Sequence, residues 1–322
     1  MKVDVIVPTY RPDETFCLLL HKLQEQTFLI HRLFIINTDE RLWRDADQNY
    51  AFTRILDGLP FPAEICHIAR EEFDHGGTRK RGALQSQADI VLFLTQDAVP
   101  ADAVLVERLA ACFDLSDSGE GAVAAAYARQ LPRGDCSVIE RFTRQFNYPD
   151  ESKKKCIDDI GTLGIKTFFC SDVCAAYRLD IYRELGGFEE PVIFNEDMLY
   201  AAKAIMRGYA VYYAAGARVI HSHNYTMAQQ FHRNFDLAVS QQQHPEIFEK
   251  ISSESEGMRL VRRTAKHLCA VKKPWLIVSL VLQSAAKYAG YAMGKRYRKL
   301  SRKRILKYTM SRDYWHRVWN ED

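Results

Sequence analysis

Short apolar runs rich in β-branched residues alternate with longer segments over the first 126 positions of the chain. In the longer segments, apolar residues recur every three or four positions, which is the spacing of one helix face. The runs predict buried strands at 3–7, 33–36, 64–68, 90–94 and 122–126. Helices are expected at 13–26, with Asp13 as cap or first-turn acid, and at 76–87 and 101–113. This alternation predicts an α/β fold: a parallel sheet with helices on both faces.

The order is looser after Tyr127. Residues 141–166 are polar and contain three consecutive lysines, so we expect a loop with a short helix there. Further helices are predicted at 178–185, 196–207 and 226–239, and short strands at 210–214 and 218–220. The small polar segment SSESEG at 252–257 predicts a boundary between a catalytic domain, 1–250, and a tail, 257–322.

Charge is divided unevenly between these two parts. Residues 257–312 contain 16 Lys or Arg and no Asp or Glu, although the whole chain of 322 residues has a net charge of only +3. Residues 1–256 hold 27 basic and 38 acidic residues, a net charge of −11. An acidic body with a cationic tail indicates two parts with different partners.

The cysteines and the first ten residues indicate the cellular compartment in which the protein is expected. The eight cysteines form no CxxC pair, which argues against a zinc knuckle. The first ten residues have neither a basic start nor a long apolar stretch, so no secretory signal is expected. We therefore expect a cytoplasmic protein with reduced thiols.

Four clusters of polar residues follow the predicted strands. In an open parallel sheet, ligands bind beyond the carboxyl ends of the strands, so these clusters are expected to line one crevice. The clusters are Thr9, Tyr10 and Arg11; Asn37, Thr38 and Asp39; residues 73–79; and Thr95, Gln96 and Asp97.

The segment with His75, Gly76 and Gly77 opens a predicted helix. Free N–H groups and the helix dipole there suit an anion, and Arg79 in the first turn adds a guanidinium for a diphosphate. A plain helix cap with a surface arginine explains the same residues equally well, and both interpretations stay open.

Three features are candidates for metal binding or acid–base chemistry. Asp97 at the end of the most apolar strand is a typical ligand for Mg²⁺ or Mn²⁺, the alternative being a turn cap. His221 and His223 alternate along an extended segment and can face one ion, although most such pairs bind none. Glu196 and Asp197 open a helix, where acids usually serve only the dipole.

The order of these motifs resembles family 2 glycosyltransferases of the GT-A fold over residues 3–240. The resemblance is carried by VDVIVPTYRP, ADIVLFLTQDAVP, the GGF…NEDM block and RGYAVYYAAGARVIHSH. The variants FDHGGTRKRGA, TQDA, ARQLP, FNYP and QQFHRNFD are similar to the bacterial rhamnosyltransferase branch, which uses dTDP-L-rhamnose for cell-surface polysaccharide.

The resemblance implies roles for individual residues. Those implied for the donor are Thr9, Tyr10, Arg11, Asn37, Asp39, His75, Gly76, Gly77, Arg79, Thr95 and Gln96. Asp197 matches the catalytic base, with Glu196 beside it, and Asp97 is the only acid left of the family's Asp-x-Asp metal motif. His221 and His223 are further ligand candidates, and Ser171, Gln230 and Arg233 lie on the implied acceptor side. Asn234 stands where processive relatives have Trp, so processive polymerisation is not expected.

The function expected from this resemblance is inverting transfer of a sugar, L-rhamnose from dTDP-L-rhamnose, to a cell-surface polysaccharide or lipid-linked glycan. Asp197 would act as general base, with Mn²⁺ or Mg²⁺ and Arg79 stabilising the departing nucleoside diphosphate. Two alternatives stay open: a hexosyltransferase using a UDP-sugar, and an inactive scaffold that binds nucleotide sugars, suggested by the missing acid at Thr95.

The basic tail contains an apolar core of eight residues, 275–282, interrupted afterwards by Gln283 and Lys287. That is short of the ~20 residues of a bilayer span and suits a helix lying on an anionic surface. We expect peripheral docking at the inner face of a bacterial membrane. A helical appendage packed on the catalytic domain is the alternative, and a nucleic-acid-binding arm is not favoured because no catalytic motif calls for one.

Overall fold

The computed structural model describes residues 1–114, 119, 121–248 and 254–321, and they form two compact units. Unit 1 comprises Met1–Leu131, Pro149–Glu190 and Glu196–His221. Unit 2 comprises Pro132–Tyr148, Pro191–Asn195 and Ser222–Asp322. The boundary expected at 252–257 therefore falls inside unit 2, and its first two residues lie outside the described part of the chain.

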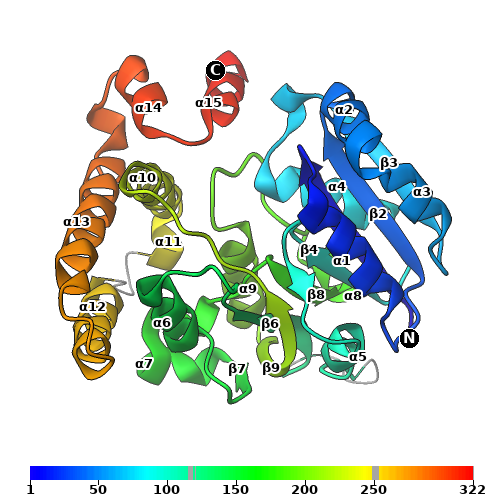
Figure 1. The fold of residues 1–322 in the computed structure, drawn as a ribbon, viewed down its shortest axis with the longest axis horizontal. Helices are drawn as coiled ribbons and strands as arrows, with labels where there is room; N and C mark the ends of the chain where they lie inside the picture. Colours follow the sequence, from blue (N-terminus) through cyan, green and yellow to red (C-terminus); the bar gives the residue numbers. More distant parts are fainter. Residues whose placement is uncertain (115–118, 120, 249–253, 322) are drawn as a thin grey trace. The chain divides into compact units, whose positions relative to one another are not determined.

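Unit 1 is built on one mixed sheet in the order β3-β2-β1-β4-β8-β6-β9-β5, with β7 paired to β9 (Figure 1). Strands β1 to β4 are mutually parallel, as expected, but β8 is antiparallel to both β4 and β6. The sheet is thus parallel only in part. The strands are β1 Val3–Tyr10, β2 Arg32–Thr38, β3 Ala63–Ile68, β4 Ile90–Leu94, β5 Val99–Pro100, β6 Val123–Leu131, β7 Lys153–Lys155, β8 Cys174–Arg178 and β9 Ala210–Ile220.

Helices cover both faces of this sheet, as predicted. Val5 and Val7 point into the core cluster that includes Phe16 and Leu20 of α1, whereas Ile6 lies against Gly82 of α4. On the α4 side, Phe93 and Tyr177 pack edge-to-face at 5.4 Å between ring centroids. The helices of unit 1 are α1 Glu14–Gln24, α2 Glu40–Tyr50, α3 Phe52–Asp57, α4 His75–Gln85, α5 Leu105–Ala110, α7 Ile160–Leu163, α8 Leu179–Glu184 and α9 Glu196–Met206. Short 3-10 helices occupy η1 Arg70–Glu72, η2 Ile157–Asp159 and η3 Gly164–Phe168.

Most of the predicted elements are confirmed, with differences at their ends. Asp13 caps α1 by accepting a hydrogen bond from the Thr15 amide. Strand β1 continues through Pro8 to Tyr10, because Pro8 lacks only a donor and its neighbours complete the pairing with β2. The two short strands expected at 210–220 form one strand, β9, and the expected loop at 141–166 contains most of α6 together with β7.

Unit 2 is helical in its described residues. Its elements are α6 Val138–Asn147, α10 Met227–Gln243, α11 Pro245–Phe248, α12 Glu254–Ala270, α13 Leu276–Gly294, η4 Tyr297–Lys299, α14 Arg302–Tyr308 and α15 Arg312–Glu321. Phe235 of α10 forms a core with Ile305 and Trp315, and Ile139, Leu268 and Leu280 form a second cluster.

Helices α10 and α13 cross in close contact because two glycines face α10. A Cβ built on Gly290 would lie 2.1 Å from the carbonyl oxygen of Phe231, and one on Gly294 would lie 2.3 Å from that of Phe235. Real atoms do not approach this closely, so glycine is required at both positions for the backbones to meet.

We predict that Gly290→Ala destabilises unit 2. Alanine in a helix normally adds about 1 kcal/mol of stability over glycine, but forcing a methyl group into a filled contact costs about 1–3 kcal/mol or more. Gly257→Ala is the matched control, since Gly257 lies on α12 with open space around its Cβ position. Urea denaturation should show a loss for Gly290→Ala and no loss for Gly257→Ala; equal stabilities would contradict the close crossing.

Candidate active site

The carboxyl ends of β1, β2 and β4 bring three of the predicted clusters together in unit 1. The Tyr10 amide donates to Oε1 of Gln96 at 2.8 Å, and Nε2 of Gln96 donates to the Tyr10 carbonyl at 3.0 Å. Thr9 donates to the side-chain oxygen of Asn37 at 3.0 Å. Adjacent parallel strands end at one edge, so this assembly follows from the strand order.

The predicted donor residues differ in exposure. Thr9 and Asn37 are buried and hold the strand ends in position, while Tyr10 and Arg11 are exposed. Asp39, with φ of 72°, caps α2 by accepting from the amides of Arg41 and Leu42. A residue not singled out from the sequence also joins this edge: His67 of β3, whose Nδ1 lies 2.9 Å from Nδ2 of Asn37.

The start of α4 is capped from within the chain. Asp74 accepts a hydrogen bond from the Gly77 amide at 2.7 Å, so one of the N–H groups considered for an anion is already bound. A Cβ on Gly77 would lie 2.5 Å from Asp74 and 2.7 Å from Glu190, so this segment packs closely. His75 remains partly exposed, with Nδ1 at 4.0 Å from Glu196. The helix-cap interpretation therefore accounts for Gly77.

Arg79 is buried in a cluster of carboxylates rather than lying on the surface. Its Nη1 donates to Glu196 at 3.2 Å, and its Nε lies 3.6 Å from Asp172. Burial alone would lower the pKa of Arg79, but the charges of Glu196 and Asp172 raise it above its usual value. Arg79 thus offsets the charges of two buried acids, one at the start of α9 and one just before β8.

Asp197 lies next to Glu196 at the start of α9 and has a raised pKa. Burial, reinforced by the charge of Glu196, raises its pKa to about 7. The Asp172 amide donates to its Oδ2 at 3.1 Å and the Met198 amide to its Oδ1 at 2.7 Å. A carboxyl group with a pKa near neutrality and a fixed orientation can take a proton at physiological pH.

Asp172, the acid that follows Ser171, was not singled out from the sequence. It is buried, and Tyr177 donates to its Oδ1 at 2.5 Å. Burial raises the pKa of Asp172 well above its usual range, and Arg79 opposes that shift. Its position next to Asp197 depends on β8, an antiparallel strand that local periodicity did not reveal.

Asp97 and His221 lie together, as the metal hypothesis requires. Oδ2 of Asp97 is 3.5 Å from Nε2 of His221, and the Asp97 side chain is 29% exposed. On the other side of the ring, Nδ1 of His221 lies 3.0 Å from Oε1 of Gln130. Nε2 of Gln130 in turn donates to Ser171 at 2.9 Å. Because an amide oxygen only accepts, this arrangement places the imidazole proton on Nδ1, so that Nε2 would be the ligand atom in a metal site.

The other predicted residues belong to unit 2. His223 follows His221 by two positions. Gln230 and Arg233 lie on α10, where Gln230 is buried and the Arg233 guanidinium stacks 4.6 Å from the centre of the Phe194 ring. Asn234 donates to the Gln230 carbonyl within the helix. Their roles toward an acceptor stay predictions.

The polar edge at the ends of β1, β2 and β4, the carboxyl groups at the start of α9 and the pair of Asp97 and His221 lie in one α/β unit of the GT-A fold, and the chain belongs to glycosyl transferase family 2. That family matches residues 4–186. The protein is therefore an enzyme that transfers sugars, as the sequence predicted.

Two curated relatives match nearly the whole chain. The O-antigen chain rhamnosyltransferase RfbN of Salmonella typhimurium is 34% identical over 99% of this chain and 97% of its own length. The O-antigen chain rhamnosyltransferase WbaN of Salmonella anatum is 36% identical over 98% and 96%. Among solved structures, the mannosyltransferase PcManGT of Pyrobaculum calidifontis, in complex with GDP-Man and Mn²⁺, is similar over 100% of this chain and 88% of its own, with TM-score 0.53 and 17% identity. That likeness supports the fold.

We predict that Asp197→Asn changes how stability depends on pH. Because the pKa of Asp197 is raised on folding, its favourable contribution is present at acidic pH and is lost as pH rises from about 4 through about 7. Between pH 5 and pH 8 the wild type should lose on the order of 2 kcal/mol of unfolding free energy relative to the variant. Chemical denaturation at both pH values measures this. Burial also raises the pKa of Asp236 to about 7, but Asp236 is present in both proteins, so its effect on stability cancels in the comparison. Parallel pH profiles would mean that Asp197 is not perturbed.

Proposed function

We propose that the protein transfers L-rhamnose from dTDP-L-rhamnose, with inversion at the anomeric carbon, to a growing cell-surface polysaccharide or lipid-linked glycan. The similarity along nearly the whole chain to two O-antigen chain rhamnosyltransferases carries this proposal. The donor binds at the carboxyl edge of β1, β2 and β4, where Tyr10, Arg11 and Gln96 are accessible.

Asp197 is the proposed general base. Its partly buried carboxylate accepts the proton of the acceptor hydroxyl while that oxygen forms the new bond to the sugar and the bond to the nucleoside diphosphate breaks. The charge pair of Arg79 and Glu196 keeps the site close to neutral, so that ionising Asp197 is possible near pH 7. One base without an enzyme nucleophile gives one inversion.

Asp97, His221 and His223 are the proposed ligands of Mn²⁺ or Mg²⁺. The pair of Asp97 and His221 supports such an ion, since a partly exposed carboxylate faces an imidazole whose proton lies on Nδ1. His223, two positions along the chain, is the third candidate. When bound, the ion would neutralise charge on the leaving diphosphate.

The protein is further proposed to work at the inner face of a bacterial membrane. The excess of cations over 257–312 favours attraction to anionic lipids, which would keep the enzyme near a lipid-linked acceptor. Among the described residues, no helix combines the length and apolarity needed to cross a bilayer.

We predict selective turnover of dTDP-L-rhamnose in a panel of nucleotide sugars, read as release of nucleoside diphosphate in the presence of Mn²⁺ or Mg²⁺ and acceptor glycan. EDTA and Asp97→Ala should abolish it, and Asp197→Asn should lower kcat by about 10²- to 10⁴-fold without loss of donor binding. Turnover of a UDP-sugar instead would keep the mechanism and overturn the donor. Donor binding without turnover, unchanged by Asp197→Asn, would favour an inactive scaffold.

Gln130 should matter through His221 rather than by contact with substrate. Replacing it by leucine keeps the size but removes the acceptor that fixes the imidazole proton on Nδ1. We predict that Gln130→Leu weakens Mn²⁺ binding by about 10- to 100-fold, which is the usual effect of losing such a partner. Titration of Mn²⁺ by electron paramagnetic resonance measures the affinity without any turnover. Gln96→Leu, on the donor edge, is the control, and equal Mn²⁺ affinity in both variants would contradict the role of Gln130.

A further inference from the structure

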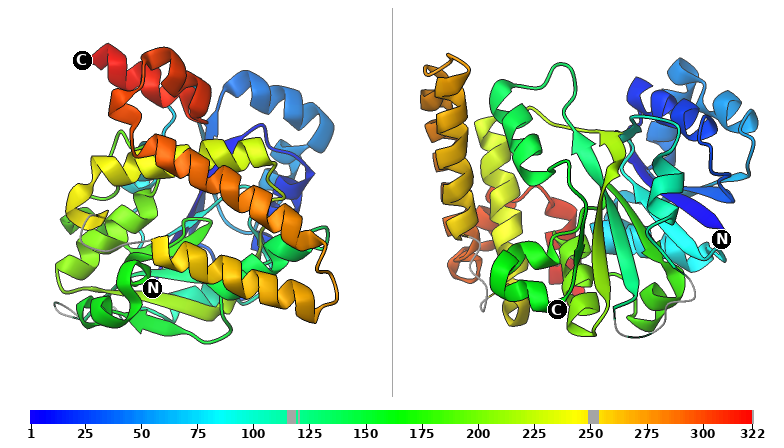
Figure 2. Two further views of the ribbon diagram at one scale, coloured as in Figure 1. Left: turned by 90° about the vertical axis from the view of Figure 1, so that its left-hand side faces the viewer. Right: turned by 90° about the horizontal axis from the view of Figure 1, so that it is seen from below.

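Helices α12 and α13 lie side by side as an antiparallel pair along one side of unit 2 (Figure 2). Leu268 of α12 and Leu280 of α13 meet in the cluster with Ile139, and Gly290 and Gly294 turn the inner face of α13 toward α10. The inner faces of both helices are therefore buried against other helices of unit 2. Their outer faces are open to solvent.

The outer face of α13 is apolar. Five large side chains on this face and just before it are 49–68% exposed: Trp275, Val278, Val281, Leu282 and Tyr288. Lys287 is the only charged residue from 274 to 294, and it is mostly buried, so that burial lowers its pKa. An exposed apolar strip of this length marks an interaction surface.

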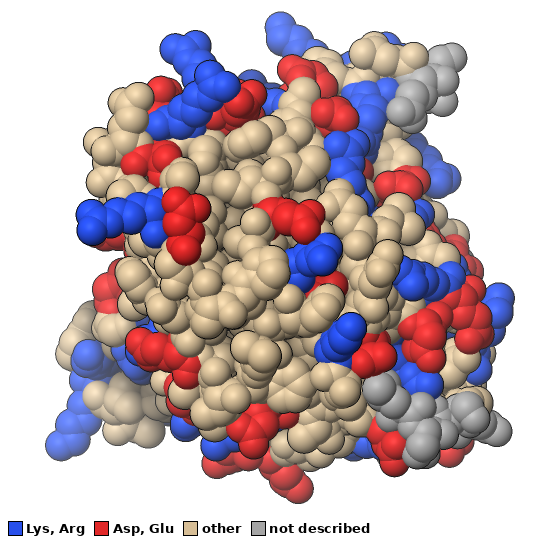
Figure 3. All heavy atoms as spheres, turned by 90° about the vertical axis from the view of Figure 1, so that its right-hand side faces the viewer, with Lys and Arg blue, Asp and Glu red and all other residues tan. Residues whose placement is uncertain are grey.

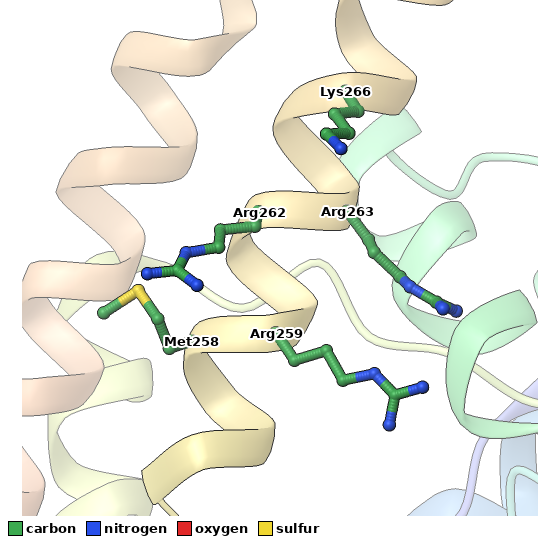
Figure 4. A pocket seen from close by; sticks show the side chains of 5 residues that line it. All are labelled: Met258, Arg259, Arg262, Arg263 and Lys266. Carbon is green, nitrogen blue, oxygen red and sulfur yellow. The ribbon is translucent and has the colours of Figure 1, made fainter.

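The outer face of α12 is cationic. Arg259, Arg262, Arg263 and Lys266 line a pocket of about 320 Å³ together with Met258, with side chains pointing to both sides of the helix (Figure 4). Lys272 and Lys273 are exposed at the start of α13, and Lys295 and Arg296 are exposed at its end. By contrast, the face of the molecule in Figure 3 shows both signs of charge interspersed.

We propose that the outer faces of α12 and α13 form one membrane-docking surface, which inserts the apolar strip of α13 into the headgroup–acyl boundary of an anionic bilayer and holds lipid phosphates in the α12 pocket. A helix that is apolar outward and bordered by cations is the pattern of helices lying in the plane of a membrane. At about 1.5 Å per residue, α13 would extend about 28 Å along the surface.

The charge of the α12–α13 surface argues against a second copy of the chain as its binding partner. Self-association through this face would bring together two copies of the segment 257–296, each with nine Lys or Arg and no Asp or Glu, whereas anionic lipids are complementary to such a surface. This inference rests on the proposed function at a membrane, and it specifies which residues make the contact. The α14–α15 segment is not part of the surface, because Ile305 and Trp315 are buried in the core with Phe235.

Cosedimentation of the full chain with vesicles tests the proposal. The wild type should bind vesicles containing phosphatidylglycerol at least ten-fold more than pure phosphatidylcholine vesicles, and salt should weaken the binding. Val278→Glu with Leu282→Glu, and separately Arg262→Glu with Lys266→Glu, should each reduce binding at least ten-fold. Leu84→Glu is the matched control, since Leu84 is 67% exposed on α4 of unit 1.

Trp275 gives a second readout that does not depend on charge reversal. Lipids brominated on their acyl chains should quench part of the tryptophan fluorescence of the wild type, and Trp275→Phe should remove that part. Donor hydrolysis without vesicles should be equal in wild type and all these variants, which separates failure of docking from failure of the glycosyltransferase proposal.

Three results would overturn the proposal: vesicle binding unaffected by the Val278 and Leu282 substitutions, no quenching of Trp275, or a dimer in sedimentation that Val278→Glu dissociates. The last would assign the surface to contact between copies of the chain.

Discussion

The ion pair between Arg79 and Glu196 is the interaction on which the catalytic unit depends. Its two partners are 117 positions apart, on α4 and α9, and both are almost fully buried. Removing Arg79 would leave the buried carboxylates of Glu196 and Asp172 without the cation that they share, which is far more costly than the pair is worth. The pair therefore fixes α9 against α4, and with it the position of Asp197.

Burial is the main cause of the raised pKa of Asp197, and the charges of Glu196 and Arg79 act on that pKa in opposite directions. Three carboxyl groups, those of Asp172, Glu196 and Asp197, surround one guanidinium, so the cluster cannot be fully ionised without excess negative charge. Burial raises the pKa values of Asp172 and Asp197, Glu196 adds to both shifts and Arg79 opposes them, so that the pKa of Asp197 reaches about 7, the range that the proposed general base requires. The raised pKa of Asp197 therefore makes the folded protein less stable near neutral pH than at acidic pH, and its carboxylate binds a proton readily.

The sequence predicted those parts of the site that local pattern determines. Parallel strands with buried runs at 3–7, 33–36 and 90–94 have only one place for a ligand, so Tyr10, Asn37 and Gln96 could be placed at one edge without a structure. Gln130 and Asp172 could not be found in this way. Their positions depend on β6 and β8, which pair across a long separation in sequence, and antiparallel pairing there has no signal in local periodicity.

The contact of Gln130 with His221 is relevant to the acid that the metal motif lacks. Thr95 occupies the place of the first aspartate, and its amide donates to the Val173 carbonyl, which ties the end of β4 to the segment carrying Ser171 and Asp172. A metal site with only one carboxylate needs a second ligand whose orientation is fixed, because a neutral ligand binds the ion well only when the surrounding residues already hold it in position. In the proposed metal site, the contacts from Ser171 through Gln130 to His221 would supply that orientation, so that a fixed imidazole would offset the loss of one charge.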